Sequence, residues 1–115
     1  MTKFDDREKA FEAKYRQDQE IAFKVNARRN KLLGLWAAEL MGLGKDDAAA
    51  YAREVVESDF DKPGDEDVLQ KVLKDFTARG VDMSEHRLRK EMDRLQQLAM
   101  EQVRKEAKPG TPEGF

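Results

Sequence analysis

The chain has 115 residues, which suits a single domain, and 40% of them are charged against 39% that are hydrophobic. The 22 lysine and arginine residues and the 24 aspartate and glutamate residues leave a formal net charge of −2, which gives no support to a nucleic-acid-binding protein. The sequence has no cysteine and one histidine, which excludes disulfides, thiolate chemistry and a histidine-based zinc site. No Ser or Thr has a plausible base and orienter, because His86 is the only imidazole. We therefore expect no enzyme, no metal and no cofactor.

The sequence also lacks membrane-spanning and signal segments. No run approaches the roughly 18 apolar residues that a membrane helix needs, and the N-terminal run MTKFDDREKAFEAKY carries acids where a signal peptide has an apolar core. Charge is uneven along the chain, since residues 1–31 hold nine bases and six acids whereas residues 44–82 hold six bases and eleven acids. We expect no direct insertion into a membrane, and a charge asymmetry that can orient a partner at short range.

An all-α fold is predicted, because Ala, Leu, Glu, Lys, Arg and Gln dominate and strand-like alternation is missing. The first helix is expected from about Asp5 to Met41, where Gly42 and Gly44 supply a stop. At about 100° per residue, its apolar residues fall on one face. These residues are Phe4, Phe11, Tyr15, Ala22, Val25, Leu32, Leu33, Trp36 and Leu40.

Three shorter helices are predicted after the first. The second begins at Asp46 or Asp47 and ends near Phe60, before a turn that contains proline and glycine. The third takes Asp65 as its N-cap and ends at Gly80, and the fourth is capped by Ser84. Their predicted inner faces are Ala48, Tyr51, Ala52, Val55 and Val56 in the second helix, Val68, Leu69, Val72, Leu73 and Phe76 in the third, and Leu88, Met92, Leu95, Ala99 and Val103 in the fourth.

Four amphipathic helices with short connections predict a four-helix bundle. The first helix would be about 55 Å long and the others about 20–33 Å, so it cannot pack along its whole length. About twenty residues must overhang, bend back or remain unfolded, and the thinly apolar N-terminal half is the natural candidate. We expect a mobile segment over residues 1–20, a bundle over residues 21–106 and a disordered tail over residues 107–115.

Two polar clusters are weighed as binding sites. Arg28, Arg29 and Lys31 could meet phosphates or an acidic partner, although a solvated helix face is the simpler interpretation, and Arg29 could extend its charge to solvent from the apolar side. The acidic stretch over residues 57–67 holds six carboxylates, but it departs from a calcium-binding loop at essential ligand positions and is interpreted as acids around a turn. His86 is expected on the surface of the fourth helix, where it could sense pH.

Several segments of the sequence resemble a known family. They are FDDREKAFEAKY at 4–15, ARRNKLLGLWAAELMGL at 27–43, AYAREVVESDFDKPGDEDVLQKVLKDF at 50–76 and GVDMSEHRLRKEMDRL at 80–95. Together they resemble the ATPase inhibitor subunit zeta of alphaproteobacterial F-type ATP synthases, over about residues 1–104.

The resemblance implies a bundle preceded by an inhibitory segment. In the family, this segment inserts as a helix into a catalytic interface of the ATPase head, between the alpha and beta subunits and against gamma, and blocks rotation in the hydrolysing direction. The matching positions in this chain are Phe4, Asp5, Asp6, Arg7, Ala10, Phe11, Lys14 and Tyr15. By this resemblance, Phe4, Phe11 and Tyr15 are interpreted as groove anchors, and Arg7 and Lys14 as charge partners.

The resemblance further implies a protein that is a monomer when free and cytoplasmic, held at the inner face of the bacterial membrane by its partners, the alpha, beta and gamma subunits. The residues alone leave alternatives open. The aromatic seam of the first segment could instead fold back on the protein's own core. The chain could also be a general helical adaptor bundle, or a nucleotide-binding sensor in which the basic cluster meets phosphates.

Overall fold

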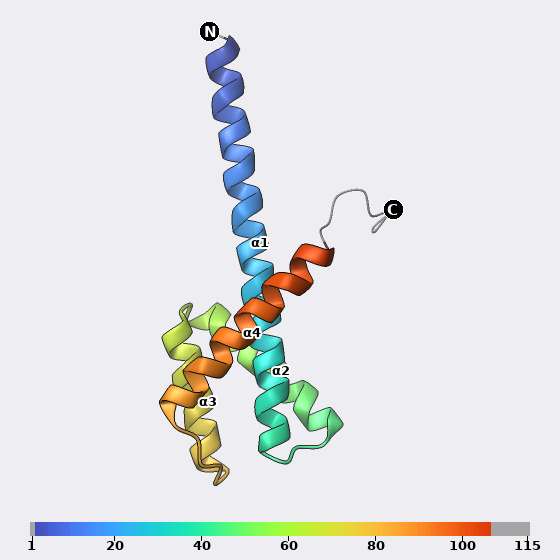
Figure 1. The fold of residues 1–115 in the computed structure, drawn as a ribbon, viewed down its shortest axis with the longest axis vertical. Helices are drawn as coiled ribbons and strands as arrows, with labels where there is room; N and C mark the ends of the chain where they lie inside the picture. Colours follow the sequence, from blue (N-terminus) through green and yellow to red (C-terminus); the bar gives the residue numbers. More distant parts are fainter. Residues whose placement is uncertain (1, 107–115) are drawn as a thin grey trace.

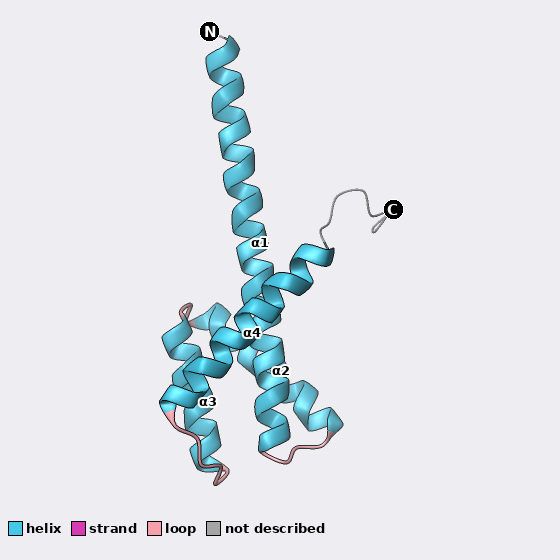
Figure 2. Cartoon of the chain, viewed as in Figure 1, coloured by secondary structure: helices cyan, strands magenta, loops and turns pink. Residues whose placement is uncertain are grey.

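The fold consists of four helices and the turns between them (Figures 1 and 2). The computed structural model describes the backbone of residues 2–106 and the side chains of residues 18–106, so the predicted tail over residues 107–115 lies outside the described residues. The helices are α1 (Thr2–Leu40), α2 (Lys45–Asp61), α3 (Asp65–Ala78) and α4 (Glu85–Glu106). No strand occurs in this part of the chain, and the prediction of an all-α bundle with a long N-terminal helix is confirmed.

Helix α1 is much longer than the bundle that it enters. Its 39 residues span about 58 Å at 1.5 Å per residue. The molecule measures 64 × 30 × 22 Å and has a radius of gyration of 17.8 Å, whereas a compact chain of this length would have about 13 Å. Figure 1 shows the first half of α1 projecting beyond the other three helices, so the overhang takes the form of a continuous helix rather than a fold-back.

The core lies between the second half of α1 and the other helices. On α4, all five residues predicted to face inward are buried, and on α3 only Leu73 of the five is partly exposed. The prediction is less accurate for α1: Ala22 and Leu40 are exposed, and Trp36 is only half-buried, with its ring edge against Phe76 at 5.7 Å between centroids. The physical reason is that α1 packs against both α2 and α4, so two faces are buried where a single stripe was expected.

Small side chains let α1 and α2 approach each other closely. A Cβ atom placed on Gly34 would lie 2.5 Å from Cα of Ala52, which is far inside ordinary contact distance. Ala37 and Ala38 follow on α1, and both are completely buried although neither was predicted in the core. The glycine is therefore required by the packing of the two helix backbones rather than by a turn.

The helix ends mostly follow the predicted signals. Gly42 and Gly80 both take φ of 75°, the left-handed conformation that ends a helix. Ser84 Oγ accepts a hydrogen bond of 3.1 Å from the backbone N–H of Arg87, as an N-cap does. The prediction that Asp65 caps α3 is wrong, because Gly64 occupies the N-cap position and the Asp65 carboxylate bonds elsewhere.

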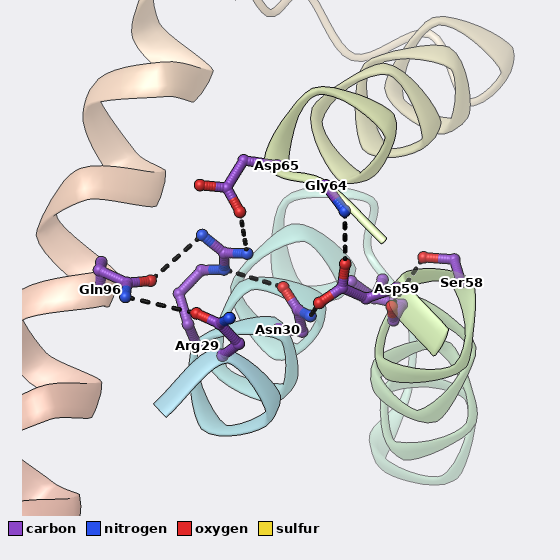
Figure 3. A network of polar contacts seen from close by, with 9 residues as sticks. Arg29, Asn30, Ser58, Asp59, Gly64, Asp65 and Gln96 are labelled. Carbon is purple, nitrogen blue, oxygen red and sulfur yellow. Dashed lines mark hydrogen bonds and ion pairs between the residues drawn. The ribbon is translucent and has the colours of Figure 1, made fainter. Parts of the chain in front are cut away.

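That carboxylate belongs to a polar network in the middle of the bundle (Figure 3). Arg29 is only 2% exposed, and its guanidinium donates to Asn30 Oδ1 at 2.8 Å, to Asp65 Oδ1 at 2.9 Å and to Gln96 Oε1 at 3.2 Å. Asn30 Nδ2 in turn donates to Asp59 Oδ2 at 2.9 Å. The expected solvated face is therefore wrong for Arg29.

The network connects all four helices. Arg29 and Asn30 lie on α1, Asp59 on α2, Asp65 on α3 and Gln96 on α4. No buried side-chain nitrogen or oxygen within the described residues lacks a hydrogen-bond partner. A buried guanidinium with fixed partners specifies the rotation of α1 about its axis, since turning the helix would leave a buried charge unpaired. The network thus fixes the direction in which each face of the projecting half of α1 is turned.

The close approach of α1 and α2 gives a first prediction. Gly34→Ala should lower the free energy of unfolding by about 1–3 kcal/mol, because the new methyl group must push two helix backbones apart. This loss should appear even though alanine favours a helix over glycine by about 1 kcal/mol. Denaturant unfolding measures it, with Glu39→Ala on the exposed side of α1 as a near-neutral control. Unchanged or increased stability in Gly34→Ala would contradict the packing.

The network gives a second prediction. Asp65→Ala should lower the free energy of unfolding by about 1–3 kcal/mol, because it leaves the buried Arg29 guanidinium without its carboxylate. Asp67→Ala is the matched control, since both acids lie in the first turn of α3 and both favour the helix dipole. Only the larger loss in Asp65→Ala can be assigned to the network, and equal losses in the two variants would exclude this role.

Candidate functional site

The candidate site is the projecting half of α1, which carries every residue of the predicted inhibitory segment. The backbone there is a continuous helix, so Phe4, Phe11 and Tyr15 share one face by its periodicity. Arg7 and Lys14 flank that face by the same count. The remaining predicted residues Asp5, Asp6 and Ala10 lie on the same projecting stretch, and the side chains of residues 1–17 lie outside the described part.

The aromatic face of the projecting half continues the apolar stripe of the packed half. Further along α1 the same stripe contains Val25 and Leu33, which are buried. Val25 packs with Ala99 and Val103 of α4. In the projecting half, no other helix of the described chain runs beside α1 (Figure 1). One apolar stripe is therefore covered by the bundle along one half of the helix and left without a neighbouring helix along the other.

The predicted phosphate cluster does not form one basic surface. Arg28 reaches across to α4, where its Nη1 donates to Gln102 Oε1 at 2.8 Å and lies 2.7 Å from Glu106 Oε2. The hydrogen bond from Arg28 lowers the pKa of the Glu106 carboxyl below its ordinary value. Arg29 is buried in the network, and Lys31 is exposed. The two guanidinium groups therefore bind different residues of the chain itself, and contact of this cluster with a phosphate or a partner stays a prediction.

The other polar candidates have structural roles. Asp59 of the acidic stretch accepts hydrogen bonds from Asn30 and from the backbone N–H of Gly64, and no group of three acidic or histidine side chains that could hold a metal occurs within residues 18–106. His86 lies exposed on α4. Among the described helices, none is long and apolar enough to cross a bilayer.

A buried tyrosine joins α2 to α3 on the other side of the bundle. The hydroxyl group of Tyr51 donates a hydrogen bond of 2.7 Å to Asp75 Oδ2. Burial raises the pKa of Tyr51 well above its ordinary value, and the hydrogen bond to Asp75 adds to the shift. Lys71 bridges Asp75 at 3.0 Å and Glu54 at 2.8 Å, so one ammonium group is shared by two carboxylates of the chain itself. It stabilises the contact between the two helices and presents no reactive group.

Two exposed phenylalanines were missed by the sequence interpretation as a pair. Phe23 of α1 and Phe60 of α2 are 54% and 57% exposed, and their ring centroids lie 5.2 Å apart with the planes tilted by 48°. They lie at the base of the projecting segment, where α1 leaves the bundle. The available signal was weak, because Phe23 falls off the main apolar stripe of its helix.

Comparisons with known proteins identify the family of the chain. The family model described as ATPase inhibitor subunit zeta matches residues 1–102. A protein solved by solution NMR shares 45% sequence identity, with a TM-score of 0.64, over 73% of this chain and 95% of that chain. A comparison with curated proteins gives no match. Because the family model extends over nearly the whole sequence, including the projecting segment, the chain belongs to the ATPase inhibitor subunit zeta family, whose general role is to inhibit an ATPase.

Proposed function

We propose that this protein inhibits ATP hydrolysis by the F-type ATP synthase by inserting residues 1–20 into a catalytic interface of its head. The interface lies between an alpha and a beta subunit and against gamma, so a wedge there stops rotation in the hydrolysing direction. The observation that carries the proposal is the projecting half of α1, an amphipathic helix with no neighbouring helix in the described chain (Figure 1).

The dimensions of the segment suit a wedge. Twenty helical residues span about 30 Å, which is enough to cross a groove between two subunits. An amphipathic helix binds a groove through apolar side chains on one face, and Phe4, Phe11 and Tyr15 lie on one face because they are seven and four residues apart. In this proposal the rings anchor the segment, while Arg7 and Lys14 meet carboxylates of the head.

The bundle keeps the wedge at its site. The buried residues that form the core run from Val25 to Val103, so the first twenty residues can enter a groove while the bundle stays outside. Linking the segment to a second contact raises its effective concentration at the groove. The partners in this proposal are the alpha, beta and gamma subunits, and the protein acts from the cytoplasm as a regulator without catalytic activity of its own.

Removing the segment tests the proposal directly. A variant that lacks residues 1–19 should lose inhibition of hydrolysis by the purified cognate enzyme, with at least about a tenfold rise in the concentration for half-inhibition. The core residues lie beyond the deletion, so circular dichroism and thermal unfolding should show an intact bundle. A folded truncated protein that inhibits as strongly as the full chain would refute insertion of the segment.

The aromatic face can be tested within the full-length chain. Phe11→Ala with Tyr15→Ala should weaken inhibition by about tenfold or more, because both rings are proposed as anchors. The melting temperature should change by no more than about 2 °C, since these residues precede the packed half of α1. Hydrolysis assays and thermal unfolding measure the two effects.

The matched control changes another face of the same segment. Glu12→Ala with Arg16→Ala removes two side chains without altering the net charge, and by helical periodicity these residues lie away from the aromatic face. Inhibition by this control should stay close to that of the unaltered protein. A large loss of melting temperature in the aromatic variant would show that its rings belong to the protein's own core instead.

A further inference from the structure

The base of the projecting segment carries an apolar surface that the insertion of residues 1–20 does not use. Phe23 and Phe60 lie on it in ring contact at 5.2 Å. On one side of Phe23 is a hollow of about 210 Å³, and on the other is one of about 330 Å³. Both hollows are lined by Phe23, Ala27 and Val56. We call the surface formed by these three residues and Phe60 the base patch.

The base patch is unusual for the surface of a small helical protein. Its two phenylalanine side chains, 54% and 57% exposed, are the most exposed large hydrophobic side chains among residues 18–106. Contiguous apolar surface that is rimmed by polar groups marks an interaction site more often than scattered apolar residues do. Aromatic residues at such sites contribute a large share of binding energy when a partner covers them.

The rim of the base patch is basic at the larger hollow, whereas Asp59 lines the smaller one. The larger hollow is also lined by Lys24, Arg28 and Lys31, with Glu106 as the one acid. Arg28 neutralises Glu106 through an ion pair of 2.7 Å, which leaves the two lysines as the exposed charges of the rim. A partner that fits this surface presents an apolar side chain for the hollow and a carboxylate for the lysines.

The position of the base patch identifies its occupant. Phe23 lies three residues beyond the proposed inhibitory segment, about 4.5 Å further along the helix axis. When residues 1–20 fill a groove, the lip of that groove therefore comes level with Phe23. Phe60 comes from the end of α2, and Val103 and Glu106 come from the end of α4, so the ends of two further helices lie close to Phe23.

We propose that the base patch is a second docking surface for the ATPase head, which receives an apolar side chain and a flanking carboxylate from the lip of the groove. This inference rests on the proposed function. The base patch also acts as a stop, because the ends of α2 and α4 widen the molecule beside α1 and limit how deep the helix enters. Its contact with the lip holds the bundle against the head and sets the register of the inserted segment.

Phe60→Ala tests the inference in the full-length protein, because it removes a ring of the base patch without changing α1. The dissociation constant for the purified ATPase head should rise by about tenfold, with a matching rise in the concentration for half-inhibition. Leu40→Ala is the matched control, since Leu40 is 46% exposed at the opposite end of the packed half of α1. Its dissociation constant should stay within about twofold. Both variants should retain their helix content and cooperative unfolding.

The outcomes separate the two proposals. One outcome would refute docking through the base patch and still support insertion of residues 1–20. In it, Phe60→Ala leaves the affinity unchanged, while Phe11→Ala with Tyr15→Ala weakens inhibition. Loss of affinity in Phe60→Ala with no effect of the aromatic pair would refute insertion and retain the base patch as the docking surface. The inference would also be refuted if the unaltered protein sediments as a dimer and Phe60→Ala sediments as a monomer. A second copy of the chain would then cover the base patch.

Discussion

The buried guanidinium of Arg29 is the interaction on which the rest of the structure depends. It lies in the middle of the bundle, and its hydrogen bonds reach α3 through Asp65 and α4 through Gln96. A charge at 2% exposure is tolerated only where its partners are fixed, so the three helices must keep one arrangement around it. Asp65 itself is 74% exposed, so water solvates the outer side of the pair and reduces the cost of burial. The network thereby holds α1 in a fixed orientation, although the helix extends well beyond it.

The fixed orientation of the packed half determines that of the projecting half, because α1 is unbroken. No glycine or proline occurs between residues 2 and 33, so the helix runs without the usual causes of a kink from its start to Gly34. Gly34 then permits the close approach to Ala52, which fixes the lower half of α1 against α2. One helix is therefore clamped over its second half and projects over its first. A force applied to the projecting half is therefore transmitted along the continuous helix to the polar network and the core.

The sequence was most informative where a helix buries a single face. Helix α4 does so, and its five predicted core positions are all buried. Helix α1 lies between α2 and α4, so one stripe could not identify Ala37, Ala38 or Asn30 as buried. The charge of Arg29 was misinterpreted because its partners come from helices that begin about thirty or more residues away in the sequence. Periodicity and length did predict the overhang, while only the family resemblance indicated a target.

The packed half of α1 also explains how the projecting half can be helical without packing against another helix. An isolated helix of about twenty residues is marginal in water, because its first turn fixes several residues for a single hydrogen bond. Here that turn already exists in the clamped half, so the projecting residues only extend a helix that the core stabilises. Each added residue then needs propagation alone, which is close to neutral for a sequence rich in Ala, Glu, Lys and Arg. In the proposed insertion, the ordering cost of entering a groove falls accordingly, and the network sets the face that the helix presents.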